Sequence, residues 1–263
     1  MRVELKSISN ARELGGYMTS DGRMVKSGVL LRTGRLDYIS DEDKSVLQNR
    51  YHVEDVIGFR MDMEIVKQQF PDGAKYHHVQ IIDTGRLDEK AAKRGLFEMS
   101  PDEFLEFIKT AENLGIFGEK MYINFLENAV GQRGYREFFR ILLESEKAVL
   151  WHCTSGKDRT GLAAMLILSA LGVKEDVIIQ DYLLTNAYNA ERIQKTRAYF
   201  LDKTNDSVTA EKAVLLIDGV SEKTMKNVLE HLKSKYDSVI GYMTDVLGIT
   251  ISEINFLREK FLI

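Results

Sequence analysis

The residues best suited to chemistry lie in one polar segment just past the middle of the chain. Cys153, the only cysteine in the sequence, is followed after five residues by Arg159. The apolar stretch 148–151 predicts a buried strand before the cysteine, and a helix is expected directly after the arginine. Loop N–H groups, a helix N-terminus and a planar guanidinium all bind anions. The spacing therefore predicts a phosphate-binding loop.

The same positive field favours the thiolate form of Cys153. A thiolate beneath a bound phosphate group is an in-line nucleophile. The segment thus predicts phosphomonoester hydrolysis through a phosphocysteine intermediate, with Arg159 binding the transferring phosphoryl group. No metal ion or other cofactor is expected, because the arginine and the backbone N–H groups supply the positive charge.

The other residues of the loop are expected to bind the substrate. Backbone N–H groups from Thr154 to Arg159 complete the phosphate cradle, and the substrate-binding residues are expected to be Thr154, Ser155, Gly156, Lys157 and Thr160. Lys157 also adds a second cation, which would suit substrates with neighbouring phosphates on a ring. We therefore expect activity on phosphotyrosine proteins and on phosphoinositides.

A leaving oxygen needs a proton, and a positioned carboxyl group contributes about 10²–10⁴-fold to such a step. Asp158 lies inside the loop beside Arg159 and is the preferred general acid. Asp83 is the alternative, because it follows the third predicted strand, where a mobile loop could reach the pocket; otherwise it is an ordinary turn residue. His152 is expected to orient the loop backbone through a hydrogen bond rather than to transfer a proton.

Other interpretations of this segment fit less well. A nucleotide-binding loop needs a glycine five positions before Gly156 and Ser or Thr after Lys157, but Trp151 and Asp158 occupy those positions. A lone buried cysteine is often inert, but Arg159 argues against that here. A sulfur-transferring rhodanese is not supported elsewhere in the chain. The competing function is a phosphate-binding module without catalysis.

The elements that must position the loop alternate between strands and helices in the first third of the chain. Strands are predicted over 28–31, 53–59 and 76–82, and a helix opens at Ser40. Residues 153–161 are expected to form the loop and 162–171 a buried helix. The final hundred residues read as helices. This order predicts an α/β fold with a central, mainly parallel sheet flanked by helices and a helical C-terminal region.

A helical insertion is expected at about 86–130 within a single domain that spans 1–263. Ser100 and Glu103 form a capping box, and Pro101 suits the first helical position. The charged stretch 86–94 would by default be a solvated helix face. Together with Phe97, Phe104 and the aromatic residue at 107, it could instead form a lid over the pocket.

The segment HCTSGKDRTG at 152–161 resembles the signature loop of the protein-tyrosine-phosphatase superfamily. Within it, the segment is similar to the loop HCxxGKDRTG of the atypical bacterial tyrosine and lipid phosphatases. The stretch 10–17, NARELGGY, resembles that family's NxRxLGGY element, and 31–36, LRTGRL, resembles its LxR[ST]GxL strand end. The stretches 181–186 and 242–262 also fit, so the resemblance covers nearly the full length.

The resemblance implies a protein-tyrosine-phosphatase-like fold. It also implies that the Thr160 hydroxyl hydrogen-bonds the Cys153 sulfur and helps it leave. One departure stands out, because the family usually reads Asp-Leu-Arg after the second strand and this chain reads Gly58, Phe59 and Arg60. The missing carboxylate puts in doubt whatever that aspartate supports, whereas Arg60 remains as a supporting residue and Glu64 remains after it.

Composition excludes several classes of protein. The 263 residues carry 36 Lys and Arg against 40 Asp and Glu, a net charge of −4, which argues against nucleic acid as a partner. One cysteine excludes an intrachain disulfide and a cysteine-based zinc site, and fits a reducing compartment. The longest apolar run, 162–171, is shorter than the roughly 20 residues of a transmembrane helix. With no signal-peptide pattern at the N-terminus, a cytoplasmic location is expected.

Overall fold

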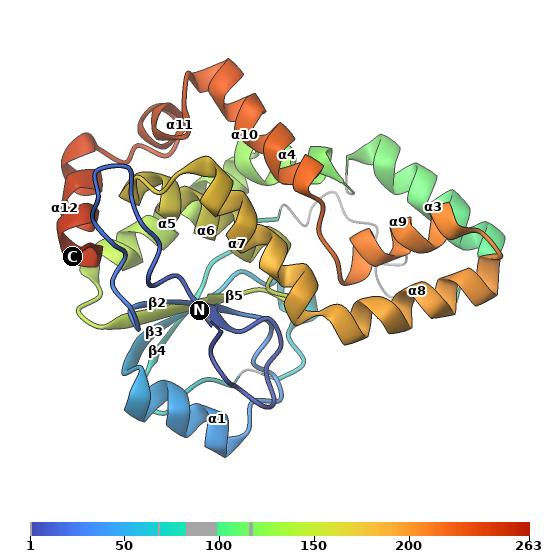
Figure 1. The fold of residues 1–263 in the computed structure, drawn as a ribbon, viewed down its shortest axis with the longest axis horizontal. Helices are drawn as coiled ribbons and strands as arrows, with labels where there is room; N and C mark the ends of the chain where they lie inside the picture. Colours follow the sequence, from blue (N-terminus) through green and yellow to red (C-terminus); the bar gives the residue numbers. More distant parts are fainter. Residues whose placement is uncertain (1, 68, 83–98, 116–117) are drawn as a thin grey trace.

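The computed structural model describes residues 2–67, 69–82, 99–115 and 118–263. A five-stranded sheet in the order β1-β2-β5-β3-β4 forms its centre (Figure 1). Short β1 runs antiparallel to β2, and the other neighbours run parallel, which confirms the predicted α/β fold with a mainly parallel sheet. The strands are β1 (Arg12–Glu13), β2 (Leu30–Thr33), β3 (Val53–Gly58), β4 (Lys75–His78) and β5 (Ala148–His152).

Helices cover both faces of this sheet (Figure 1). One face carries α1 (Asp41–Ser45), and the other carries α5 (Ala129–Glu144), α6 (Asp158–Leu171) and α7 (Glu175–Tyr188). The predicted helical C-terminal region is confirmed. Its remaining helices are α8 (Ala190–Thr204), α9 (Ser207–Ile217), α10 (Glu222–Tyr236), α11 (Val239–Asp245) and α12 (Ile251–Phe261). In the described residues, no helix is long and apolar enough to cross a membrane.

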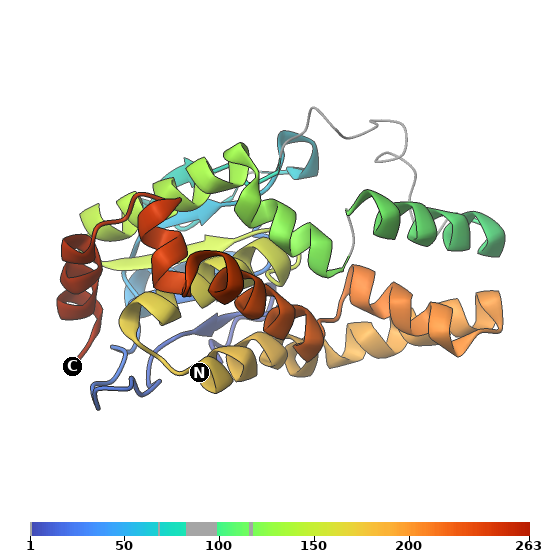
Figure 2. The same ribbon diagram turned by 90° about the horizontal axis from the view of Figure 1, so that it is seen from above.

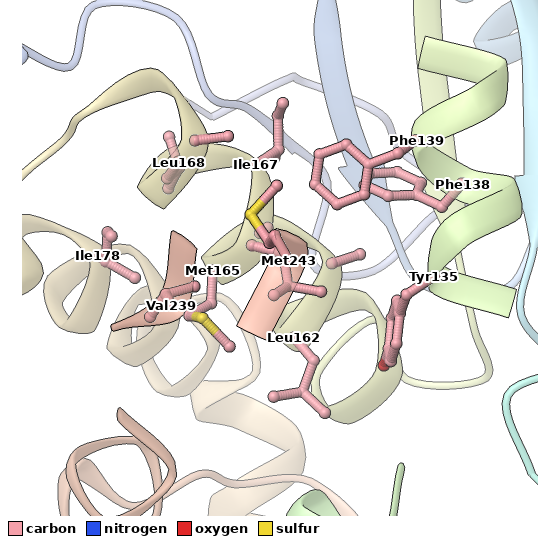
Figure 3. Packing of buried hydrophobic residues seen from close by; sticks show 14 of the residues in the cluster. Tyr135, Phe138, Phe139, Leu162, Met165, Ile167, Leu168, Ile178, Val239 and Met243 are labelled. Carbon is pink, nitrogen blue, oxygen red and sulfur yellow. The ribbon is translucent and has the colours of Figure 1, made fainter. Parts of the chain in front are cut away.

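The central strand β5 is buried along its whole length because both of its faces are covered. Val149 belongs to the larger core cluster, whereas its neighbour Leu150 belongs to the cluster on the α1 side. This alternation follows from the two-residue period of a strand. Figure 3 shows the larger cluster, where Phe138 of α5, Leu162 of α6 and Met243 of α11 lie close together. This burial on both faces fixes the position and direction of β5, the strand that leads to the loop.

Two predicted boundaries are wrong by four residues, and the strand predicted over 28–31 lies at Leu30–Thr33. The buried helix begins at Asp158 and not at 162. Its first turn is polar, so apolar periodicity could not reveal it, although an acidic first residue suits a helix N-terminus. The third predicted strand ends at His78 and not at 82, because its ladder partner β3 ends at Gly58. Val79 N still donates to the Gly58 carbonyl, but the pairing stops there.

Part of the predicted insertion is helical. Asp83, residues 86–98 and 116–117 lie outside the described residues, whereas α3 (Pro101–Leu114) and α4 (Glu119–Glu127) lie within them. The predicted capping box forms, since Glu103 N donates to Ser100 Oγ and Ser100 N donates to Glu103 Oε2. Figure 2 shows α3 beside α8 and α9, away from the sheet. These three helices share a separate apolar cluster that includes Phe104 and Phe200, with ring centroids 4.2 Å apart.

Candidate active site

The central strand β5 leads into the predicted loop at the carboxyl edge of the sheet. In the ladder, His152 pairs with Thr33 at the end of β2 and with Gly58 at the end of β3. Because these strands are parallel, the segments that follow them emerge side by side. Residues 34–37, 59–64 and 153–157 therefore share this edge, and the last of them enters α6.

Backbone carbonyl groups of the loop are held from outside by the N-terminal part of the chain. Arg35 N donates to the Thr154 carbonyl at 3.1 Å. Asn10 Nδ2 donates to the carbonyls of Ser155 and Gly156 at 3.2 and 2.9 Å. Three successive loop carbonyls thus have partners in the N-terminal part of the chain.

This anchoring orients the loop N–H groups. In a planar trans peptide the N–H points opposite to the C=O. The N–H groups of Ser155, Gly156 and Lys157 therefore point away from the anchors. Within the described residues, no backbone N–H of 154–159 donates to a protein acceptor. The loop and the first turn of α6 together present a row of unpaired donors, which is the arrangement that binds anions.

A buried ionic cluster supports the same anchoring. Arg32 Nη2 donates to the Gly156 carbonyl at 2.9 Å, and Arg32 Nη1 donates to Asp181 Oδ2 at 2.8 Å. Asp181 Oδ1 accepts from Arg12 Nε and Tyr17 Oη, each at 3.0 Å. Burial disfavours the charged carboxylate, but the two arginines outweigh burial and hold the pKa of Asp181 below its ordinary value. Burial, with the charge of Arg12, lowers the pKa of Arg32 to about 10.

Glycine is required at position 156 for two reasons. Its φ of +66° lies in the left-handed region, which other residues rarely adopt. A Cβ atom there would also lie 2.4 Å from the Thr33 carbonyl oxygen and 2.8 Å from Gly34 N. Both are backbone atoms that cannot rotate away. The loop can pack against the end of β2 only without a side chain at this position.

Hydrogen bonds from the two Nη atoms of Arg159 hold its guanidinium group in one orientation. Nη1 donates to the Phe59 carbonyl at 2.9 Å and to Glu64 Oε2 at 2.6 Å, and Nη2 donates to Glu64 Oε1 at 2.8 Å. Of the five N–H groups, Nε–H and the second Nη2–H have no acceptor within the described part of the chain. These two lie on a common edge and form a fork that fits two phosphate oxygens.

Glu64 links this arginine to the loop. Its carboxylate also accepts from Thr154 Oγ1 at 2.7 Å and from Met61 N at 2.8 Å. Burial opposes its ionisation, but the hydrogen bonds and charge of Arg159 prevail and lower the pKa of Glu64 to about 2. Burial likewise opposes the charge of Arg159, but Glu64 raises the pKa of this arginine above its ordinary value. Both groups stay charged at neutral pH.

Cys153 lies between β5 and this row of donors, with 2% of the residue exposed. The charge of Arg159 acts on its sulfur. His152 is fully buried, and its Nδ1 lies 3.3 Å from the Cys153 carbonyl, the loop-backbone contact that was predicted. Burial, with the nearby charge of Arg60, lowers the pKa of His152 to about 3, so the ring is neutral. The Thr160 hydroxyl is buried without a partner in the described residues, so the predicted hydrogen bond to the Cys153 sulfur is not formed.

Asp158, the preferred acid, occupies the first position of α6. Its carboxylate accepts a hydrogen bond from the Tyr122 hydroxyl of α4, and that hydroxyl lies 2.7 Å from the Tyr182 hydroxyl of α7. Burial, with the charge of Asp158, raises the pKa of Tyr122 well above its ordinary value, so the phenol remains a donor. The alternative acid, Asp83, lies outside the described residues.

Lys157 does not serve as the predicted second phosphate-binding cation. Its side chain is buried, and its Nζ donates to the carbonyls of Leu215, Leu216 and Gly219 at 2.7, 3.0 and 3.2 Å. An ammonium group has three N–H donors, so all of them are occupied. The sequence reveals the charge of Lys157 but not that α9 lies within its reach.

The departure at position 58 has a steric explanation. A Cβ atom on Gly58 would lie 2.0 Å from Tyr76 Oη and 2.7 Å from Tyr76 Cζ. The Tyr76 hydroxyl thus fills the space that a side chain at 58 would need. Nearby, Arg60 Nη1 donates to both carboxylate oxygens of Asp37 at 2.7 Å, so Arg60 is neutralised without a carboxylate at position 58.

Comparison with known proteins agrees with this geometry. The sequence matches the tyrosine phosphatase family over residues 3–263. The chain belongs to this family. It is 28% identical to the triple specificity protein phosphatase PtpB of Mycobacterium tuberculosis, over 98% of each chain. It is 30% identical to a protein of Cupriavidus necator provisionally named a tyrosine-protein phosphatase, over 94% of this chain and 85% of that one. A tyrosine-protein phosphatase of Nostoc commune is 25% identical over 90% of this chain and 75% of its own.

This chain is therefore a phosphoric monoester hydrolase. Sequence reasoning identified its loop but assigned no role to the residues that anchor it. Asn10, Arg12, Arg32 and Asp181 were noted only as parts of a resemblance, and all four are buried around the loop. An available signal was the position of Arg32 directly after the apolar residues 29–31, since a charged residue is rarely buried without a partner. In the described residues, no group of His, Cys, Asp and Glu gathers as a metal site.

Proposed function

We propose that the chain hydrolyses phosphotyrosine in proteins through a phosphocysteine intermediate. The Cys153 thiolate attacks phosphorus in line, so that a P–S bond forms as the P–O bond to the tyrosyl oxygen breaks. That oxygen takes a proton and leaves as the phenol. Water then attacks phosphorus, the P–S bond breaks, and inorganic phosphate is released with the thiolate restored.

The observation that carries this proposal is the outward anchoring of three loop carbonyls. It turns the N–H groups of Ser155, Gly156 and Lys157 to one side, and Arg159 adds its free Nε–Nη2 edge. Donors that are fixed before the substrate arrives stabilise developing charge without reorganisation, and each is worth about 10²–10³ in rate at comparable sites. Glu64 keeps the arginine fork in place.

We assign the proton of the first step to Asp158. Its position at the start of α6 and its contact with the Tyr122 hydroxyl support this role, since a positioned carboxyl group must be held in a single orientation. Asp83 remains the alternative. Replacement of each by asparagine separates them, because only the acid's variant loses the alkaline limb of the kcat profile.

The names of the relatives support phosphotyrosine as the substrate class, because two are named tyrosine-protein phosphatases. The extension to phosphoinositides depended on Lys157, and the contacts of its ammonium group give that extension no support. A phosphoinositide therefore belongs in the substrate panel as a test. A thiolate nucleophile without a second cysteine suits a reducing compartment such as the cytoplasm.

The decisive experiment compares the wild type with Cys153→Ser. With EDTA present at pH 6–7, the wild type should hydrolyse a chromogenic phosphomonoester and a phosphotyrosine peptide. The serine variant should lose turnover but still bind the labelled peptide in a fluorescence anisotropy assay, because the donors belong to the backbone and Arg159. Substantial turnover by the serine variant would exclude the thiolate mechanism. Binding without turnover by the wild type would indicate a non-catalytic module.

A further inference from the structure

Lys157 joins the catalytic loop to a distant part of the fold. Its backbone occupies the N-cap position of α6, and its N–H belongs to the row of unpaired donors. Its side chain is directed to the end of α9, where the ammonium group contacts three carbonyl oxygens within 3.2 Å. Only 3% of the residue is exposed. The contact with α9 is therefore buried, and the ammonium group also lies 3.9 Å from Asp158 Oδ2 within the loop's own helix.

The three acceptors are suited to bind a cation. The carbonyls of Leu215 and Leu216 belong to the last turn of α9, where helix carbonyls lack intrahelical partners and carry partial negative charge. Gly219 lies in the turn that follows. Asn186 of α7 and Asn189, which follows this helix, hold the same turn through the Val220 and Asp218 carbonyls. The ammonium group thus binds a fixed set of oxygens and satisfies the end of the helix.

The helix that it contacts belongs to the part of the fold that extends from the sheet. Figures 1 and 2 show α8 and α9 as a hairpin beside α3, away from the strands. Their apolar cluster is separate from the two clusters that enclose the sheet. A displacement of α9 would therefore act on the catalytic loop through Lys157.

We propose that Lys157 is a positioning residue that ties the catalytic loop to the C-terminal end of α9, so that the α8–α9 hairpin helps to set the active shape of the loop. This inference rests on the proposed phosphatase mechanism. This role differs from substrate binding, because Lys157 would hold the shape of the catalytic loop and would not contact the substrate through its side chain. Its loss should impair every phosphomonoester substrate by the same factor.

The experiment compares Lys157→Met, Lys157→Arg and the control Lys223→Met, which removes an exposed lysine charge from α10. We expect kcat/KM of the methionine variant to fall about 10–100-fold, since misplacement of reacting groups by about 1 Å can cost 10²-fold. The loss should be equal for a phosphotyrosine peptide and a micellar phosphoinositide wherever both are hydrolysed. The arginine variant should recover part of the activity, and the control should match the wild type.

Hydrogen exchange followed by mass spectrometry reports on both ends of the tie. In Lys157→Met, amides of 214–220 and of 153–159 should exchange faster, with no such change in the control. If Lys157→Met keeps the kcat/KM of the wild type, the proposed role of Lys157 is refuted and the phosphatase mechanism stands. A loss confined to the phosphoinositide would assign Lys157 to substrate binding instead. If Lys157→Met does not fold, Lys157→Arg is used for the test, and a loss of kcat/KM on the phosphoinositide alone in that variant also refutes the proposed role. An inactive wild type would refute the proposed function itself.

Discussion

Gly58→Ala should destabilise the protein because of Tyr76. A Cβ atom at this position meets Tyr76 Oη at 2.0 Å and Cζ at 2.7 Å. The ring has little freedom to yield, since it stacks on Phe70 with centroids 5.3 Å apart and planes at 18°. Gly58 is not among the residues with positive φ, so the backbone itself would accept alanine. The penalty is therefore steric.

The expected size follows from these contacts. Overpacking of a well-filled interior costs about 1–3 kcal/mol. For a chain of this length that corresponds to a fall in Tm of about 2–12 °C, at about 2–4 °C per kcal/mol. Without the clash, the sign should reverse, because Gly→Ala at a compatible backbone stabilises by about 0.4–1 kcal/mol through the unfolded state. Tyr76→Ala removes the clashing ring and supplies that reference.

The assay is a double-mutant cycle from urea unfolding of the wild type, Gly58→Ala, Tyr76→Ala and the double variant. We expect a coupling energy of about 1–3 kcal/mol, within the usual range for residues in contact. The alanine at 58 should destabilise the wild type and be neutral or stabilising in the Tyr76→Ala background. An equal cost in both backgrounds would show that Tyr76 does not explain the glycine.

Three further outcomes are expected. Gly156→Ala should fold but lose at least about 100-fold in kcat/KM for a chromogenic phosphomonoester, since a displaced N–H donor costs about 10²–10³; near-normal turnover would contradict the anchored loop. Glu64→Gln should lower the free energy of unfolding by about 3 kcal/mol, from a pKa near 2 against 4.5 when unfolded. That difference is fully present above pH 4.5 and is lost only as pH falls through 2, so urea unfolding should give a constant difference from pH 8 to 5. Tyr122→Phe removes the hydroxyl that holds the Asp158 carboxylate in place, so kcat should fall, and an unchanged kcat would contradict the acid role of Asp158.

Local patterns predicted much of the fold because β5 is a short apolar run and some helices carry clear N-caps, such as Ser40 and Ser100. The strand before Cys153 and the helical C-terminal region were evident because burial on both faces requires continuous apolar residues. A helix boundary could not be predicted where residues of the active site interrupt the apolar periodicity of the helix. The first turn of α6 consists of polar residues that serve the site, so it resembled a loop.

Contacts between distant segments could not be predicted from local sequence. The spacing of Cys153 and Arg159 identifies the loop, but Glu64 reaches Arg159 only because β3 and β5 are neighbours in the sheet. Lys157 was misassigned for the same reason, since its acceptors are backbone carbonyls about 60 residues away, which carry no signature of residue type. Every residue has a backbone carbonyl, so the sequence does not indicate which carbonyls accept a hydrogen bond from a charged side chain.

The anchoring of the loop by the N-terminal segment also has a consequence for synthesis. Asn10 and Arg32 leave the ribosome early, but the loop carbonyls that they hold are 145 and 124 residues later, and Asp181 is later still. At about 5–20 residues per second, the two halves of this network are separated by roughly 6–30 s of translation. Contacts of such sequence separation form late in folding. The buried network that anchors the phosphate-binding loop can therefore be completed only after α7 has emerged, because Asp181 belongs to that helix.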